Sequence, residues 1–377
     1  MKEVFIVADN IYSPIGNSSA ENMAALKRNQ SGIARHENPA LSPTPFFASL
    51  FDSSEQHTDH FYLDGYTRFE QLMIASIKDA LKNTDIDPRD PETAMIISST
   101  KGNIGLIESE PYSSSLAEKV SLHHSAKKIA GYFHSTHQPI VVSNACISGL
   151  LALLTGMRLI QSGQFKHAVV VGCDLITKFI LSGFQSFMAI SNSPCKPFDA
   201  ERDGISLGEA AATVILSSQK KSADDIRLAG GSISNDANHI SGPSRTGEEL
   251  ALAIRRALSQ SGIHPNEIDF ISAHGTATIY NDEMEAKAIS LSGMVSVPVN
   301  SLKGNYGHTL GAAGLVESIA SIHSLKENIV LPTKNFINSG VSKPLHISST
   351  LQTIELRNAL KTASGFGGCN AALVFSK

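Results

Sequence analysis

Four residues with chemically reactive side chains sit among small residues, directly after apolar segments. Cys146 lies between the β-branched run 140–142 and the apolar run 150–154, and His274, Lys303 and His308 lie in the small-residue stretches 272–278 and 301–314. This pattern predicts that Cys146 sits at a strand-to-helix turn, where free N–H groups and the helix dipole lower a thiol pKa from about 8.5. A nucleophilic cysteine is one interpretation, and a buried core cysteine is the alternative.

Together, these residue types favour acyl transfer. A cysteine attacks a thioester and holds the acyl group. Nε2–H groups of His274 and His308 are suited to donate to an enolate oxygen, and backbone N–H groups in the glycine-rich stretch 365–368 to approach an oxyanion. Thr276 and Thr278 have the spacing of a strand-like segment and are suited to hydrogen-bond an amide-bearing arm, although plain β-propensity explains them equally well.

An internal repeat predicts how these residues are positioned. Segments 69–81 and 250–258 carry apolar residues at helical spacing, and each precedes a proline turn and a short apolar strand. Residues 80–88 align without a gap on 257–265 and share Ala, Leu, Ile and Pro. A capping box at 246–249 and a stop at Gly262 mark the ends of the second helix. We therefore predict two duplicated α/β halves, residues 1–225 with the thiol and residues 226–377 with the two histidines.

The composition is that of a globular protein, with 42% hydrophobic and 18% charged residues and a formal net charge of −4. We expect no nucleic-acid partner, because there is no overall basic field. We expect no membrane span, because no run of about 18 apolar residues occurs. The amino-terminal residues do not resemble a secretory signal, which predicts a cytoplasmic protein. The four cysteines lack CxxC spacing, so we expect neither a disulfide framework nor a metal site.

The order of the motifs resembles the β-ketoacyl-acyl-carrier-protein synthases of the thiolase superfamily, specifically the elongating class with a Cys-His-His triad. The matching stretches are residues 13–17, 30–33, 144–146, 197–199, 202–204, 274–276, 303–314 and 365–368. His308 favours the elongating class, because related classes have asparagine there. The resemblance implies a thiolase-like α/β fold, in which the two halves contribute mixed sheets to an α-β-α-β-α layered arrangement.

The resemblance also implies roles for the reactive residues. Cys146 would carry the acyl chain, and His274 and His308 would promote decarboxylation of malonyl carrier protein and stabilise the resulting enolate. Lys303 would support the site electrostatically. Glu317 would pair with this lysine or orient its surroundings.

The resemblance assigns further roles to residues expected around the nucleophile. The backbone N–H groups of Cys146 and Phe366 would form the oxyanion hole, and the Phe366 ring would gate the pocket. Thr276 and Thr278 would contact the phosphopantetheine arm. Two more aromatic residues, Phe184 and Phe187, either line the acyl pocket or belong to the core. Cys369 stands where the family usually has threonine; we interpret it as a packed thiol, and the second reactive cysteine of true thiolases is the alternative.

The activity implied is a 3-oxoacyl-[acyl-carrier-protein] synthase, which joins a Cys146-bound acyl group to a decarboxylated malonyl unit in fatty-acid or polyketide and polyene biosynthesis. It implies acyl carrier protein as a partner, a homodimer or a heterodimer with a related subunit, and no cofactor. Two alternatives stay open: a non-catalytic subunit that sets chain length, and a thiolase acting on coenzyme A esters. The preferred acyl chain is not predicted.

Overall fold

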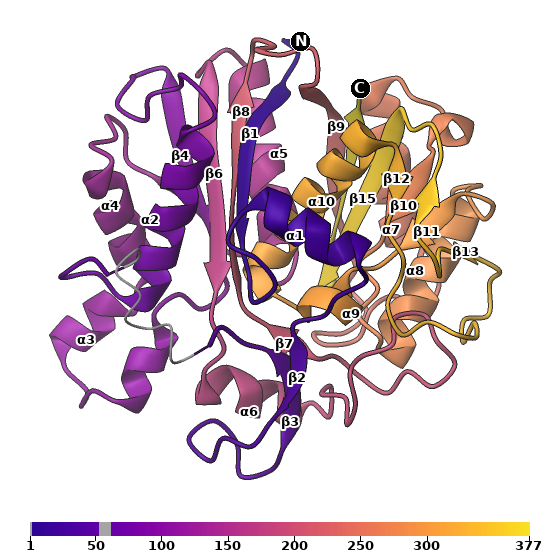
Figure 1. Ribbon diagram of the computed structural model, residues 1–377, viewed down its shortest axis with the longest axis horizontal. Coiled ribbons are helices and arrows are strands. Elements are labelled where there is room, and N and C mark those ends of the chain that lie inside the picture. Colours follow the sequence, from indigo (N-terminus) through magenta and orange to yellow (C-terminus); the bar gives the residue numbers. More distant parts are fainter. Residues whose placement is uncertain (1, 53–61) are drawn as a thin grey trace.

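Two half-sheets with the same strand order lie edge to edge in the computed structural model, which describes residues 2–52 and 62–377 (Figure 1). The first runs β5-β4-β6-β8-β1 and the second β11-β10-β15-β16-β9, with β13 outside β11. The first-half strands are β1 (Phe5–Tyr12), β4 (Thr93–Ser98), β5 (Ile140–Val142), β6 (His167–Asp174) and β8 (Ala210–Ser217). The second-half strands are β9 (Ile226–Asn235), β10 (Phe270–Ser272), β11 (Pro298–Asn300), β13 (His346–Ile347), β15 (Asn358–Gly365) and β16 (Cys369–Ser376).

The pairing pattern repeats between the halves. Strand β8 pairs antiparallel with β1 and β6, and β4 pairs parallel with β6 and β5. In the second half, β16 pairs antiparallel with β9 and β15, and β10 pairs parallel with β15 and β11. The halves meet through a short antiparallel contact between β1 and β9. This confirms the duplicated mixed α/β architecture, while the exact boundary between residues 225 and 226 stays a prediction.

Helices form three layers around the two half-sheets (Figure 1). Helices α5 (Ser148–Gln161) and α10 (Ala313–Glu327) contact strands of both half-sheets and each other, and so form the middle layer. Helices α2 (Arg68–Leu81) and α4 (Leu122–Tyr132) cover the outer face of the first half, and α7 (Glu248–Ser261) and α8 (Ile279–Leu291) that of the second. The predicted α-β-α-β-α arrangement is confirmed.

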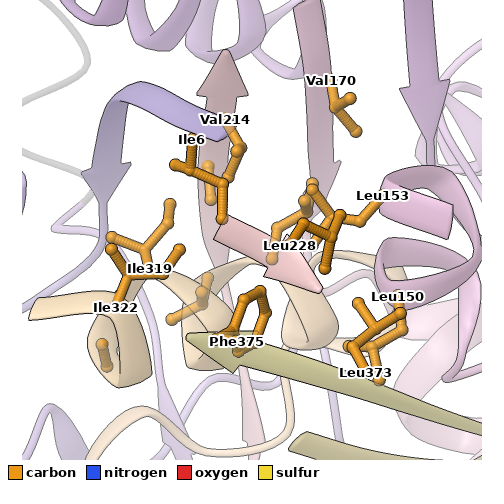
Figure 2. Close-up of a cluster of buried hydrophobic side chains, with 14 of the residues drawn as sticks. Ile6, Leu150, Leu153, Val170, Val214, Leu228, Ile319, Ile322, Leu373 and Phe375 are labelled. Carbon is orange, nitrogen blue, oxygen red and sulfur yellow. The ribbon is translucent and has the colours of Figure 1, made fainter. Parts of the chain in front are cut away.

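The middle layer is held by apolar side chains and by a close helix crossing. Figure 2 shows Leu150 and Leu153 of α5 and Ile319 and Ile322 of α10 packed with side chains from both half-sheets. Burying each such side chain contributes about 1.5–3 kcal/mol. A Cβ on Gly314 of α10 would lie 2.5 Å from the backbone nitrogen of Leu150, so the two helices touch through their backbones. This contact fixes the amino-terminal ends of α5 and α10 relative to each other.

The repeated outer helices match their predicted ranges, but one predicted cap is wrong. Gly262 ends α7 with a φ of 72°, as expected. The capping box at 246–249 does not form, because α7 begins at Glu248 after Gly247, whose φ is 77° and which makes no side-chain cap. Packing against α8 explains the difference: a Cβ on Gly247 would lie 2.6 Å from the Met284 carbonyl oxygen.

Smaller elements surround the layered core. The remaining helices are α1 (Ser19–Lys27), α3 (Ser114–Lys119), α6 (Lys178–Ser186) and α9 (Lys303–Tyr306), with short 3-10 turns η2 (Ile104–Glu108), η3 (Pro265–Glu267) and η4 (Leu310–Ala312). Two small sheets combine β2 (Ile33–His36), β3 (Phe46–Ser49) and β7 (Leu207–Gly208), and β12 (Ile329–Val330) with β14 (Gln352–Thr353). Among the described residues, no helix is long and apolar enough to cross a membrane.

Candidate active site

Cys146 lies in the turn between β5 and α5, as the sequence predicts, and is 8% exposed. Ala145 before it has a φ of 45°, a conformation that non-glycine residues rarely adopt and that is often found at functional sites. Ser148 fixes the turn: its hydroxyl accepts from the Asn144 N–H at 2.8 Å and donates to the Ala145 carbonyl at 2.7 Å. The first turn of α5 thus holds the thiol at the helix start.

The pKa of the Cys146 thiol departs from the expectation. Burial raises this pKa to about 12, and the nearby Cys369 thiol adds to the rise. The Lys303 charge and a hydrogen bond from the Phe366 backbone N–H act in the opposite direction but do not outweigh burial. The expected lowering at a helix N-terminus is therefore wrong for the free protein, in which Cys146 is protonated at neutral pH.

His274 and His308 face each other beside this thiol. Their ring centroids are 5.2 Å apart at an interplanar angle of 84°, and both side chains are buried. The Cys146 Sγ and one ring nitrogen of each histidine lie within 4.8 Å of one another. Thiol and imidazole groups at this spacing are also able to ligate a metal ion such as zinc; the expectation that the protein holds none stays a prediction.

Hydrogen bonds assign the same tautomer to both histidines. The Leu310 N–H donates to His308 Nδ1 at 3.2 Å, and the Lys303 ammonium approaches His274 Nδ1 at 3.5 Å. Nδ1 is therefore the acceptor in each ring, and Nε2 carries the proton. Burial, followed by the Lys303 charge, holds the pKa of both histidines well below the ordinary value. Each ring is thus a neutral Nε2–H donor.

Lys303 and Glu317 form the predicted pair directly behind His274. Their side chains are buried and in direct contact, and Lys303 Nζ also donates to the His274 carbonyl at 3.0 Å. A third member of this cluster, Lys361 of β15, was not predicted; its Nζ lies 2.9 Å from Glu317 Oε2. Because β15 also contains Asn358, Thr362 and Ser364, its sequence gives no signal that singles out this lysine.

Two buried carboxylates, neither of them predicted from the sequence, hold the backbone around the histidines. Glu285 of α8 accepts from the backbone N–H groups of His274 and Gly275, each at 2.8 Å. Asp174 at the end of β6 accepts from the Gly311 N–H at 2.7 Å, just after His308. Burial raises the pKa of Asp174, although several hydrogen bonds to its oxygens oppose that rise.

A cavity of about 450 Å³ opens from the thiol and the two imidazoles towards the surface. It has the volume of a small-ligand site. Its walls include the remaining predicted side chains, Thr276, Thr278, Phe184, Phe187 and Phe366. They also include the loop of residues 239–243, which was not predicted.

Phe366 lies between the other two aromatic residues of this wall. Its ring stacks on Phe184 at 5.8 Å and meets the edge of Phe187 at 5.4 Å, and all three rings line the cavity. Phe184 also packs against a small apolar core cluster, so for this residue both interpretations hold. The hydroxyl oxygens of Thr276 and Thr278 are 2.9 Å apart and form a hydrogen bond. They lie beyond β10, which ends at Ser272, and Thr278 caps α8, so the strand-like assignment of this pair is wrong.

Cys369 packs behind the loop that carries Phe366. Its Sγ lies 3.4 Å from the Phe366 carbonyl oxygen, and all four cysteines are free thiols. A Cβ on Gly365 would lie 3.0 Å from both the Cys146 nitrogen and the Cys369 sulfur, so a larger residue there would push against the backbone of the nucleophile. Burial raises the pKa of Cys369 to about 11, which agrees with a packed thiol.

The layered fold and the Cys-His-His site together define a thiolase-like condensing enzyme. Family comparison specifies this class further: the "Beta-ketoacyl synthase, N-terminal domain" model matches residues 1–222, and the "Beta-ketoacyl synthase, C-terminal domain" model matches residues 226–337. The chain therefore belongs to the beta-ketoacyl synthase family and is a condensing acyltransferase.

Individual relatives agree with this assignment. The 3-oxoacyl-[acyl-carrier-protein] synthase 2 of Vibrio harveyi is 30% identical, with 100% of this chain and 99% of the relative covered. A solved structure described as the ishigamide ketosynthase/chain length factor has a TM-score of 0.89 at 25% identity, covering 100% and 99% of the two chains. A beta-ketoacyl synthase from Burkholderia phymatum STM815 has a TM-score of 0.90 at 24% identity, covers 100% of both chains, and supports the fold.

Proposed function

We propose that this chain is a 3-oxoacyl-[acyl-carrier-protein] synthase that performs decarboxylative condensation. One observation carries the proposal: the Cys146 thiol and the imidazoles of His274 and His308 meet at the inner end of one cavity. A nucleophile and two neutral Nε2–H donors are the groups that acyl transfer and enolate stabilisation need.

In the first step, Cys146 Sγ attacks the thioester carbonyl of an acyl carrier protein. The C–S bond to the carrier's arm breaks, the released thiolate takes the proton that Cys146 gives up, and the acyl group stays on Cys146. The backbone N–H groups of Cys146 and Phe366 face the oxyanion of the tetrahedral intermediate. The raised pKa of Cys146 means that this thiol loses its proton only as the reaction proceeds.

In the second step, malonyl carrier protein enters the same cavity and loses CO₂. The electron pair of the broken C–C bond moves into an enolate, whose oxygen accepts hydrogen bonds from His274 and His308. The enolate carbon then attacks the Cys146-bound carbonyl, the C–S bond breaks, and the released cysteine thiolate takes a proton from solvent. The product is a 3-oxoacyl thioester, longer by two carbons, on the carrier protein.

The remaining predicted residues support these steps. Lys303 and Glu317 hold the His274 backbone and tautomer through the contacts described above. Thr276 and Thr278 line the entrance, where they contact the phosphopantetheine arm. Phe366, between Phe184 and Phe187, gates the acyl end of the cavity. Acyl carrier protein is the partner, the reaction needs no cofactor, and we place it in the cytoplasm.

The second candidate is a partner subunit that sets chain length in a heterodimer. It is favoured by the similarity to a structure described as a ketosynthase/chain length factor. The intact Cys146, His274 and His308 set favours catalysis instead. We also propose that the chain assembles as a homodimer or as a heterodimer with a related subunit.

The test is condensation by the purified chain with acyl- and malonyl-carrier protein, followed by mass spectrometry of the carrier. We expect a 3-oxoacyl product from the wild type and from Cys173→Ala, a control at a buried cysteine of β6. Cys146→Ala is expected to abolish it. Condensation that survives Cys146→Ala would overturn the proposal, and turnover of coenzyme A esters without malonyl substrate would favour a thiolase.

A further inference from the structure

Lys361 is a fully buried lysine in the middle of the second half-sheet. It lies on β15, between β10 and β16, and has 0% exposure. An ammonium group removed from water is costly unless charges and hydrogen bonds replace its hydration. The role of Lys361 therefore lies in the groups that surround its Nζ.

Four oxygen atoms surround this ammonium group. Nζ donates to the carbonyl oxygens of Ser272 at 3.0 Å, Ala273 at 3.2 Å and Thr362 at 2.7 Å, and it lies 2.9 Å from Glu317 Oε2. Carbonyl and carboxylate oxygens converging on one point are the groups that replace the hydration shell of monovalent cations in proteins. The Lys361 ammonium group thus lies where a monovalent cation would be coordinated, and it is supplied by the chain's own side chain.

The four oxygen atoms around the Lys361 ammonium form an oxygen cage, and two of them belong to the residues that precede His274 in the chain. Ser272, Ala273 and His274 are consecutive; the first two carbonyls accept from Lys361, and the third accepts from Lys303. On the other side of this backbone, Glu285 accepts from the His274 N–H and also from the Thr362 hydroxyl at 2.6 Å. Lys361 therefore holds the two carbonyls that precede His274, and Glu285 holds the His274 amide.

The charges of this cluster balance when all members are present. Glu317 lies between the ammonium groups of Lys303 and Lys361, and Glu285 is the second buried carboxylate nearby. Without Lys361, Lys303 would be the one cationic contact left to Glu317 among the residues that the structure describes. The Lys303 ammonium, which also contacts His274 Nδ1, would then experience a different field.

We propose that Lys361 is a positioning residue whose ammonium group takes the place of a bound monovalent cation. It fixes the backbone carbonyls of the two residues before His274, and it shares the Glu317 carboxylate with Lys303. Its activity test rests on the proposed condensation reaction. A displacement of about 1 Å in a positioned group costs on the order of 10²-fold in rate. Loss of Lys361 should lower decarboxylation far more than it changes the KM for malonyl carrier protein.

A matched pair of variants separates this role from general destabilisation. Lys361→Ala removes the ammonium group and leaves the space between the four oxygen atoms empty. Lys361→Met fills the space of the lysine side chain with an uncharged side chain. We expect kcat for malonyl decarboxylation to fall about 10²-fold in both. Ammonium or potassium chloride should restore kcat in Lys361→Ala at least tenfold, while Lys361→Met and the wild type should not respond. Choline chloride at equal ionic strength is the salt control.

A melting experiment tests the cage without relying on catalysis. A cation that binds the folded variant raises its Tm, so ammonium should stabilise Lys361→Ala relative to choline and leave Lys361→Met unchanged. Where Lys361→Ala does not fold in choline, the refolded yield in each salt is measured instead. Wild-type kcat in both variants, or no difference between ammonium and choline for Lys361→Ala, overturns the inference. A wild type without decarboxylase activity contradicts the proposed function alone, and the melting result still tests Lys361.

Discussion

Replacing His308 with alanine removes one of the two Nε2–H donors that face Cys146. The Leu310 N–H fixes the His308 tautomer, so the wild-type ring presents its proton to the cavity. Loss of one preorganised donor to a developing oxyanion costs about 2.7–4 kcal/mol, or 10²–10³-fold in rate. Since His274 keeps its own donor, we expect His308→Ala to retain slow decarboxylation.

The assay compares two partial reactions of the same protein. CO₂ release from malonyl carrier protein measures the step that needs the donor, and acyl transfer from acyl carrier protein to Cys146 measures the step that does not. We expect the first to fall 10²–10³-fold and the second to fall less than tenfold. His346→Ala, at an exposed histidine, is the control, and thermal melting checks folding. Equal losses in both steps, or a decarboxylation loss below tenfold, would show that His308 is not a donor to the enolate oxygen.

Two further outcomes follow from burial and packing. Since the pKa of Cys146 is raised to about 12, its thiolate fraction should grow about tenfold per pH unit between pH 7 and 10; iodoacetamide alkylation should rise accordingly, and a plateau near pH 8.5 would contradict this. Gly314→Ala should lower the free energy of unfolding by about 1–3 kcal/mol, because its Cβ meets the α5 backbone. Gly131→Ala, in open space on α4, should raise it by about 0.4–1 kcal/mol, and equal Tm values for the two variants would be inconsistent with the helix crossing.

Much of the architecture could be predicted from the sequence because local patterns and contacts agree. The apolar spacing of 69–81 and 250–258 specifies helices that pack on the two half-sheets at corresponding positions. Cys146, His274 and His308 each follow a strand or a short helix, and the duplicated topology brings these chain segments to one place. The family resemblance supplied the pairing of Lys303 with Glu317, and the structure places this pair in contact with the His274 backbone.

The residues that escaped prediction depend on contacts between distant segments. Lys361 reads as an ordinary polar position in a strand, and only the pairing of β15 with β10 places it over the Ser272 carbonyl. Asp174 becomes a site residue because Gly311 approaches it from the other half of the chain. The pKa of Cys146 was predicted in the wrong direction because a helix start is visible in the sequence, whereas burial of the thiol is not.

Intact-protein mass spectrometry, with peptide mapping of the acylated residue, shows whether Cys146 carries the acyl group that condensation consumes. After incubation with acyl carrier protein, the chain should gain one acyl mass, located on Cys146. Malonyl carrier protein should then remove that mass, with release of CO₂ and appearance of the two-carbon-longer 3-oxoacyl carrier protein. An acyl group found on another residue, or one that stays on Cys146 while malonyl carrier protein is decarboxylated, would contradict the account.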